Sequence, residues 1–362
     1  MSVYRQVSYV ALMRTLSNGR ALRRAALLLV TVMLALLAGP AAAAPQDTVI
    51  TITVGGDCTL GSDQGKQGSY TLGGVLKAQD GDYGYFFRNL QPWFGTDDLT
   101  IVNCEGTFTE SSRPEERAFN FKGKADYANI FKAGSVEMVN ISNNHSMDYG
   151  EQGVRDTRRA LYDAGVRYFG EKQFANYDVN GIKIGVIGYN MVLNGRNTKE
   201  KVAADIQYLK KIYPIVLVSF HWGNENVPRI NGTQATFGKW AIDNGADFVF
   251  GHHPHILHGI AQYKGKYIVY SLANLCFGGN AGPPDYDTMI VQQRFKVTQD
   301  GQVENVGIKV IPCRVSSVRS PNNYQPTPCD AENSARVLSK LQKLCDGVPD
   351  GLTAIPTAFP GE

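Results

Sequence analysis

The segment GHHPHILHG, residues 251–259, holds four of the six histidines in this 362-residue chain. It follows a short apolar run at 247–250, and its flanking glycines allow a ligand or another part of the backbone to come close. A single histidine beside a strand is usually a hydrogen-bonded structural residue, whereas clustered imidazole nitrogens are typical of metal sites. The segment therefore indicates metal chemistry at the end of a strand. Its histidines are His252, His253, His255 and His258.

Four other predicted strands also lead into side chains that can bind a metal. The strands are predicted at 48–54, 99–103, 136–142 and 215–220, and the groups that follow them are Asp57, Glu105, Asn144 with His145, and His221. Taken singly, each group has a structural explanation as a turn residue or a packed core imidazole. In α/β sheets, however, ligands bind outside the carboxyl ends of the strands, so five such groups are expected to converge. The pattern predicts one metal-binding crevice.

The chemistry of these donors restricts the metal. Two carboxylates, one carboxamide and three imidazoles combine hard oxygen with borderline nitrogen, a set that suits zinc, manganese or iron. Six donors exceed the needs of one tetrahedral ion, so we expect one or two divalent metal ions, with a shared carboxylate if there are two. Two such ions outweigh two carboxylates in charge, and an anionic substrate is therefore expected.

The motifs around these residues resemble a known family. In order, and over nearly the whole chain after residue 45, they are similar to the capsule synthesis protein CapA family, which itself resembles the calcineurin-like metallophosphoesterases. The resemblance implies an α/β fold, a metallophosphoesterase-like α-β-β-α sandwich, and a link to poly-γ-glutamate capsule. The segments are GGDCTLG (55–61), VNCEGTFT (102–109), SNNHSMDYGEQG (142–153), HWGNENVP (221–228), GHHPHILHG (251–259), SLANLCFGGN (271–280) and PPDYDT (283–288).

The resemblance also implies a role for each site residue. Glu105 corresponds to the bridging acid, and His145 to the catalytic imidazole that faces the substrate and stabilises charge or protonates a leaving group. The other implied metal ligands are Asp57, Asn144, His221, His253 and His255. His252 and His258 match no ligand position, and we interpret them as residues behind the ligands or on the surface.

One position departs from the metallophosphoesterase pattern. Those enzymes usually open with Asp-x-His, but Thr59 stands where that histidine would be. One metal subsite therefore lacks a nitrogen ligand, which favours a single ion or a narrower chemistry.

The six cysteines offer several interpretations. Export would permit disulfides, and their irregular spacing without a C-x-x-C argues against a structural zinc site. Cys313, Cys329 and Cys345 share the C-terminal region and could supply one bridge. The others lie beside the site motifs and are interpreted as small buried residues, with a bridge or an extra soft ligand as alternatives. They are Cys58, Cys104 and Cys276.

Substrate-binding residues are expected around the metal. Lys122 and Lys124, in the Gly-containing segment FNFKGKADY, could bind a phosphate or a polyanion, although they could equally be solvated surface lysines. Glu225 could orient His221 or bind an amine. Asn274, together with Asp285 and Asp287, is expected to shape the far wall.

Three functions remain open from the sequence. The first is a metal-dependent hydrolase or transferase acting on a phosphoester or a γ-glutamyl amide, for which His145 beside Asn144 is the main argument. The second is a non-catalytic component that binds polymer or a membrane-bound capsule synthase, which the missing histidine at Thr59 favours. A secreted nucleotidase is the third, and it needs an aromatic clamp for a base; Trp222 is the candidate.

The N-terminus predicts export. Residues 1–24 contain five arginines and no acidic residue, an apolar run follows at 25–38, and an A-x-A site ends near Ala44. We favour a cleaved signal over a membrane anchor because the apolar run is short and Pro40 interrupts its end. The protein is therefore expected in the cell envelope or outside the cell. Five of the 36 basic residues precede residue 45, leaving 31 against 33 acidic ones and a net charge of −2. Nothing in this balance suggests a nucleic-acid partner.

The remaining chain alternates short β-branched runs with amphipathic segments, which predicts α/β organisation. Further strands are expected at 182–189, 247–250 and 267–272, and helices at 151–165, 199–212 and 233–245. Three segments are predicted: the signal at 1–44, the metallophosphoesterase-like domain at 46–312, and a C-terminal extension at 313–362. The extension is expected to hold a short helix near 331–345 and a Pro-rich tail. The long polar stretches at 61–84 and 106–124 are expected to be functional or disordered loops.

Overall fold

A computed structural model of the chain describes residues 47–170, 172–192 and 197–362. The predicted export signal lies outside these residues. Asp47–Glu362 form one compact unit, and the boundary predicted at 312 falls within the strand Val303–Arg314. No helix in the described part is long and apolar enough to cross a membrane.

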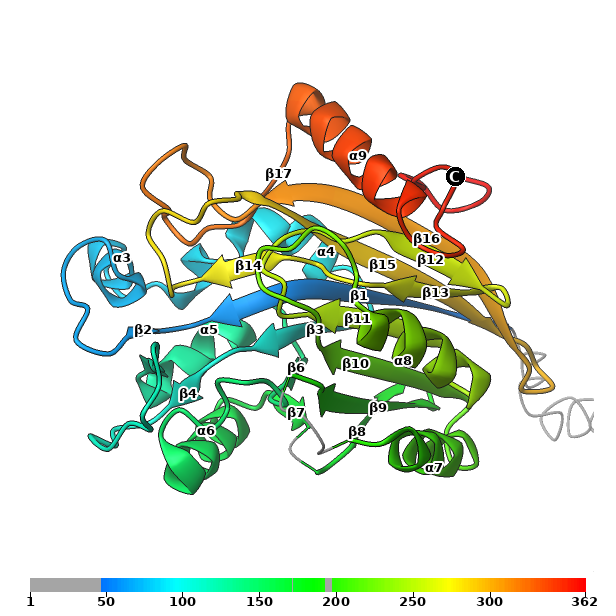
Figure 1. Cartoon of the computed structure of the whole chain (residues 1–362), viewed down its shortest axis with the longest axis horizontal. Helices are drawn as coiled ribbons and strands as arrows, with labels where there is room; N and C mark the ends of the chain where they lie inside the picture. Colours follow the sequence, from blue (N-terminus) through cyan, green and yellow to red (C-terminus); the bar gives the residue numbers. More distant parts are fainter. Residues whose placement is uncertain (1–46, 171, 193–196) are drawn as a thin grey trace, which may run out of the picture. The chain divides into compact units, whose positions relative to one another are not determined.

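The larger sheet of the described residues has eight strands in the order β17-β16-β15-β1-β3-β6-β7, with β14 pairing with β1. β1, β3, β6 and β7 run parallel to one another, while β15 is antiparallel to β1. Parallel pairing brings the carboxyl ends of β1, β3 and β6 to one edge (Figure 1). The strands are β1 Thr48–Thr59, β3 Leu99–Cys104, β6 Met138–Asn140, β7 Arg167–Phe169, β14 Asn274–Phe277, β15 Asp287–Val297, β16 Val303–Arg314 and β17 Thr327–Pro328.

A second sheet of six strands has the order β12-β13-β11-β10-β9-β8. Its four central strands are parallel, and the outer strands β8 and β12 are antiparallel to their neighbours. Figure 1 shows the arrows of β9 and β10 pointing in the same direction as those of β1 and β3. The strands are β8 Ala175–Val179, β9 Ile182–Asn190, β10 Ile215–His221, β11 Phe248–His252, β12 Ile260–Tyr263 and β13 Lys266–Val269.

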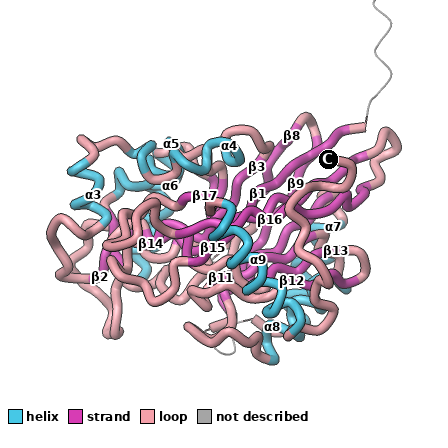
Figure 2. The backbone as a smooth tube through the Cα atoms, turned by 90° about the horizontal axis from the view of Figure 1, so that it is seen from above, coloured by secondary structure: helices cyan, strands magenta, loops and turns pink. Residues whose placement is uncertain are grey.

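Helices cover the outer faces of the two sheets. Figure 2 shows α3 to α6 gathered at one side of the strands and α7 with α8 at another. The α-helices are α3 Leu72–Ala78, α4 Gln91–Phe94, α5 Ala128–Ala133, α6 Gly150–Asp163, α7 Lys199–Lys210, α8 Gly232–Asp243 and α9 Ala331–Asp346. The 3₁₀-helices are η1 Tyr83–Tyr85, η2 Arg88–Leu90 and η3 Ala125–Tyr127.

Successive side chains along a strand belong to different apolar clusters, and the buried side chains form three such clusters. In β10, Leu217 belongs to the cluster between the sheets, whereas the next residue, Val218, packs with α7 and α8 residues on the outer face. In β3, Ile101 faces the inter-sheet cluster and Val102 faces the cluster with α4 to α6. Successive strand residues point to opposite faces, so buried strands feed two layers at once. The expected α-β-β-α sandwich is confirmed.

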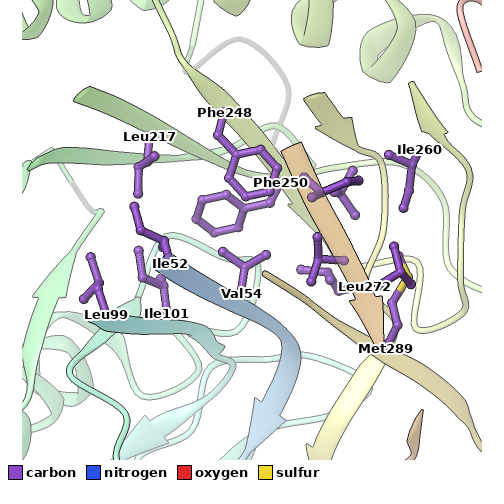
Figure 3. Packing of buried hydrophobic residues seen from close by; sticks show 14 of the residues in the cluster. Ile52, Val54, Leu99, Ile101, Leu217, Phe248, Phe250, Ile260, Leu272 and Met289 are labelled. Atoms are coloured by element: carbon purple, nitrogen blue, oxygen red, sulfur yellow. The ribbon is translucent and has the colours of Figure 1, made fainter. Parts of the chain in front are cut away.

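The inter-sheet cluster, which lies between the two sheets, is the largest of the three apolar clusters. It positions the site. Figure 3 shows Ile52 and Val54 of β1 beside Phe248 and Phe250 of β11, all fully buried. Each such side chain contributes roughly 1.5–3 kcal/mol by leaving water. The two sheets are therefore held face to face, which fixes the strand ends of one sheet against those of the other.

Helix α9 closes one side of this layer. Its apolar residues Val337, Leu341 and Cys345 belong to the inter-sheet cluster, and the helix packs on β16 and β12 (Figure 1). On its polar side, the Arg336 guanidinium donates two hydrogen bonds to Asp287, at 2.6 and 2.8 Å. Lys340 binds both Asp285 and Asp287, so these two acids hold α9 rather than facing a ligand.

The first strand continues beyond its predicted end. The sequence places that end at residue 54, but β1 runs to Thr59, with a register shift between Val54 and Asp57. A Cβ atom on Gly56 would lie 2.0 Å from the Ala273 carbonyl oxygen, so only glycine fits there. The shift lets β1 pair with β14, which the sequence did not reveal, and places Asp57 within the strand.

The long polar stretches contribute three short strands to a small third sheet. β2 (Ser62–Asp63), β5 (Phe121–Gly123) and β4 (Thr107–Phe108) form it in that order. Thus residues far apart in sequence lie together beside the end of β1.

The cysteines are all unpaired in the structure. Cys58, Cys104 and Cys276 are buried, as the preferred interpretation expects, and they occupy facing positions on three neighbouring strands. The bridge considered among the three C-terminal cysteines is not formed.

Candidate metal centre

Two buried carboxylates lie at the carboxyl edge of the larger sheet. Asp57 is fully buried; its Oδ1 accepts a hydrogen bond from Asn103 Nδ2 at 2.8 Å and its Oδ2 accepts one from the His253 backbone N–H at 3.2 Å. Glu105 follows β3 and is also buried, but neither of its oxygens has a hydrogen-bond partner among the described residues. An unpaired buried carboxylate is strongly unfavourable unless a cation compensates it.

Three imidazoles reach the same place from the second sheet. His221 is the last residue of β10, and His253 and His255 follow β11. His253 has φ of 95° and His255 has φ of 59°, both in the left-handed region that non-glycine residues rarely adopt. Such strain persists where the surroundings impose it, commonly at functional sites. Here it turns both rings toward the carboxylates.

Asn144 joins the two sheets at this point. Its Oδ1 lies 2.6 Å from Nε2 of His221, while Nδ1 of His221 lies 3.4 Å from Nδ2 of Asn103. His221 Nε2 also lies 3.8 Å from Glu105 Oε1. Oxygen and nitrogen lone pairs from three separate chain segments therefore converge on one point.

The donor atoms form overlapping groups in which all atoms lie within 4.8 Å of one another. One group contains Glu105, His221 and His253, and another contains Asp57, Glu105 and His255. Glu105 is common to both. A third group adds the exposed Glu225 to His253 and His255. Mixed carboxylate and imidazole donors with unpaired atoms fit divalent metal ions, and the shared carboxylate fits a pair of them.

The ionisation of these residues reflects their crowding. Burial, with the nearby Asp57 charge, raises the pKa of Glu105 to about 8. Burial opposes ionisation of Asp57 as well, yet its contacts with His252 and His255 hold its pKa well below the ordinary value. Burial lowers the pKa of His221, and it lowers that of His253 to about 4, so both imidazoles are neutral, as metal ligands must be.

His145 lies at the edge of the same cluster and is oriented by Asp148. Its Nδ1 lies 2.8 Å from Asp148 Oδ2, an oxygen that also accepts the Phe121 backbone N–H at 2.7 Å. Burial disfavours the imidazolium, but the hydrogen bond to Asp148 and the Glu105 charge outweigh it and raise the pKa of His145. Arg117 donates to the Asn144 carbonyl and stands 3.4 Å from Asp148. Asp148 was not among the residues predicted from the sequence, although its position three residues after His145 was a possible signal.

A network of asparagines, also missed, holds the loops. Asn140 and Asn143 both donate to Oδ1 of Asn103, at 3.0 and 3.3 Å, and Asn143 donates to the Cys104 carbonyl at 2.8 Å. Asn103 in turn donates to Asp57. The network ties the ends of β1, β3 and β6 together, so the donors keep fixed relative positions.

A cavity of about 200 Å³ adjoins the centre, and we call it the His145 cavity. Two predicted substrate residues line it: Glu225, and Asn274, whose Oδ1 accepts a hydrogen bond from His255 Nδ1 at 2.9 Å. Its other lining residues are Lys66, Phe119, Phe121, His145, Asn226, His255, Phe277, Gly279, Asn280, Pro283 and Pro284. No contact joins Glu225 to His221 among the described residues.

Lys122 and Lys124 do not line the His145 cavity. They line a separate hollow on the other side of β5. Phe121 and Lys122 are consecutive strand residues, so they point to opposite faces, and Phe121 is the one that faces His145, with ring centroids 4.4 Å apart. The register of β5, which the sequence does not reveal, therefore determines that Phe121 rather than Lys122 faces the His145 cavity.

Three remaining aromatic groups have supporting roles. His252 is fully buried; its Nδ1 lies 3.4 Å from Asp57 Oδ1, and neither nitrogen completes a hydrogen bond. His258 lies between Gln234 and the Val227 carbonyl, at 3.1 and 2.8 Å. Trp222 is fully buried against Phe220 and donates to the Tyr270 carbonyl, so it offers no clamp for a base.

Residues 51–279 match the family described as bacterial capsule synthesis protein PGA_cap. The chain belongs to this family. The matched range includes every residue of the metal centre and its asparagine network.

The sequence identity between this chain and individual relatives is low. The chain is 28% identical over 263 residues to the PGA biosynthesis protein CapA of Bacillus subtilis (strain 168), covering 67% of this chain and 69% of that one. It is 29% identical over 240 residues to the capsule biosynthesis protein CapA of Bacillus anthracis, and this match covers 58% of either protein. Among solved structures, the NAD nucleotidase of Haemophilus influenzae aligns over 82% of this chain and 63% of its own, with 11% identity and a TM-score of 0.43.

Proposed function

We propose that this PGA_cap protein is a metal-dependent hydrolase that cleaves a phosphoester or a γ-glutamyl amide in an anionic, capsule-related substrate. The observation that carries the proposal is the state of Glu105, whose buried oxygens lack hydrogen bonds and which belongs to two donor groups at once. Such a carboxylate is stabilised by cations on either side. Divalent ions bound there supply Lewis acidity toward a substrate oxygen and acidify water near neutral pH.

The chain's own residues supply orientation and a proton. Asp148 holds Nδ1 of His145, which leaves Nε2 for the substrate in the His145 cavity. From there the imidazole can donate a proton to the leaving group. Asn274 fixes the ring of His255, and Lys66 at the cavity wall provides a positive charge for an anionic group.

The cellular location and the related polymer are proposed from the N-terminal sequence and from the names of the relatives. The basic and apolar segments before Ala44 support export to the cell envelope or beyond. The names of the two Bacillus proteins, PGA biosynthesis protein CapA and capsule biosynthesis protein CapA, support poly-γ-glutamate as the related polymer. A membrane-bound capsule synthase is proposed as a partner. We propose no nucleic-acid partner.

A second candidate is a non-catalytic component that binds polymer or a synthase. It is favoured by Thr59, which is buried and leaves Asp57, Glu105 and His255 as the only side chains in one donor group. With three donors, that subsite would hold its ion weakly.

The test begins with metal content. The full chain is produced in an exporting bacterial host, purified without chelators and analysed by elemental mass spectrometry. It is then assayed with p-nitrophenyl phosphate and with a γ-linked glutamate oligomer. About two ions per chain, with hydrolysis lost in His145→Ala and metal content retained, are expected. Full metal content without hydrolysis of either substrate would favour the second candidate. No binding of zinc, manganese or iron would overturn both metal-based proposals.

A further inference from the structure

A hollow larger than the His145 cavity lies outside the metal centre. It has a volume of about 980 Å³ and is formed by the loop from Gly61 to Thr71, the start of α3 and one face of β5. We call it the lysine hollow because it is lined by Lys66, Lys77, Lys122 and Lys124. The chemistry proposed for the metal centre uses Lys66 but requires none of the other three residues.

The charges in the lysine hollow are poorly balanced. Asp63 and Glu110 are its only acidic lining residues, so the lining carries a net charge of +2. Within the described part of the chain, Lys66, Lys77 and Lys124 form no ion pair, and all three side chains are exposed. Lys122 is partly engaged, since its ammonium donates to the Ser111 carbonyl and lies over the Tyr149 ring. Unpaired ammonium groups in a concave surface attract an anion.

The other lining residues indicate what kind of anion. They are mainly glycines and short amide or hydroxyl side chains, such as Gln64, Gln67 and Ser69, which can bind the amide groups of a peptide-like chain. No stacking platform is offered: Tyr149 is only 3% exposed, and Tyr127 packs against an apolar cluster. Single-stranded nucleic acids are commonly held on such platforms. A volume near 1,000 Å³ also reaches the upper limit for one small molecule.

The hollow is adjacent to the reacting centre. Lys66 lines both the lysine hollow and the His145 cavity. Between them runs β5, with Phe121 on the cavity side and Lys122 on the hollow side. A linear ligand that occupied both would pass Lys66.

We propose that the lysine hollow binds a stretch of an amide-linked polycarboxylate chain, several repeats away from the bond held at the metal centre. This inference rests on the proposed function for its choice of polymer and extends it to a separate binding site. Each lysine neutralises a free carboxylate carried by a repeat of the chain, while the glutamine and serine side chains bind the backbone amides.

The test is a binding experiment that needs no turnover. A fluorescein-labelled γ-linked glutamate decamer is titrated with full-length protein, metal-loaded or treated with EDTA, and followed by anisotropy at several salt concentrations. The variant is Lys77→Gln/Lys124→Gln, which leaves Lys66 at the wall of the His145 cavity unchanged. The matched control is Lys183→Gln/Lys343→Gln, which removes two exposed lysines that form no ion pair among the described residues and lie outside the hollow. We expect the variant to bind about tenfold more weakly with a shallower salt dependence, and the control to bind as wild type.

Two results would overturn the inference. One is equal loss of affinity in variant and control, because general charge would then explain binding. The other is equally tight binding of a polyphosphate or an oligothymidylate of the same charge. Hydrolysis of p-nitrophenyl phosphate separates this inference from the proposed function. The double variant should keep this hydrolysis, because Lys77 and Lys124 do not line the His145 cavity. If the metal-loaded wild type shows no hydrolysis, the hydrolase proposal is rejected, and the decamer titration still tests the lysine hollow.

Discussion

The Asn144 side-chain oxygen lies 2.6 Å from Nε2 of His221, although the two residues come from different sheets. Asn144 follows β6 of the larger sheet, and His221 ends β10 of the second. The candidate metal centre is therefore built across the sandwich rather than along one sheet. Any change that shifts one sheet against the other would separate the donors. The inter-sheet cluster is therefore required for the geometry of the metal centre.

Glu105 should control all metal binding. Because it belongs to both main donor groups, Glu105→Gln is expected to lower metal affinity more than about 100-fold, whereas His255→Ala should affect only one of two ions. Elemental mass spectrometry and calorimetric titration with zinc or manganese measure this. Wild-type metal content in Glu105→Gln would remove the shared-ligand assignment.

Asp148 should affect the reaction without affecting the metal. Asp148→Asn weakens the hydrogen bond that orients His145 Nδ1, and kcat is expected to fall about 100-fold. Metal content should stay at the wild-type level, because Asp148 belongs to none of the donor groups. Since Asp148 also accepts the Phe121 N–H, thermal unfolding of the variant must be measured in parallel. An unchanged kcat would contradict the positioning role.

His252 should tune metal affinity through Asp57. Its Nδ1 is close to the Asp57 oxygen that Asn103 also contacts, so His252→Gln is expected to loosen the carboxylate and lower metal affinity about 10–100-fold. His258→Gln is the matched control, since the His258 imidazole contacts Gln234 and the Val227 carbonyl and belongs to none of the donor groups. That control should lose about 1–2 kcal/mol of stability and keep its metal affinity. Equal metal affinities for the two variants would exclude the role of His252.

Asp97 should make stability depend on pH. Burial raises its pKa to about 7 in the folded protein, against an ordinary value of 3.8. Between these values the folded state holds a proton that the unfolded state has lost, so the free energy of unfolding falls as pH rises from about 4 to 7. Asp97→Asn should remove this slope and be roughly 1–3 kcal/mol more stable than wild type at pH 8.

Urea denaturation at pH 4, 6 and 8 checks the Asp97 prediction. Asp98→Asn is the control, because Asp98 accepts the Thr51 N–H and should leave the pH slope as it is in wild type. A slope as steep in Asp97→Asn as in wild type would assign it to other groups, such as Glu105.

The sequence by itself predicted the donor set and the central parallel strands of both sheets. Clustered histidines, Asp57, Glu105 and Asn144 each follow an apolar run, and parallel strands deliver their carboxyl ends to one edge. The helices expected at 151–165, 199–212 and 233–245 are present as α6, α7 and α8, because their apolar periodicity is a local property.

Only the tertiary structure decided how the two sheets face each other and which groups serve the site from a distance. Strand pairing is set by contacts between residues far apart in the chain, so the β14 pairing at the Gly56 bulge could not be read locally. The same holds for β5, where a register choice turned Phe121 toward His145 and Lys122 toward the lysine hollow. Asp148 and Asn103 gained their roles from the atoms that packing placed beside them, since a hydrogen bond depends on geometry that residue type alone does not supply.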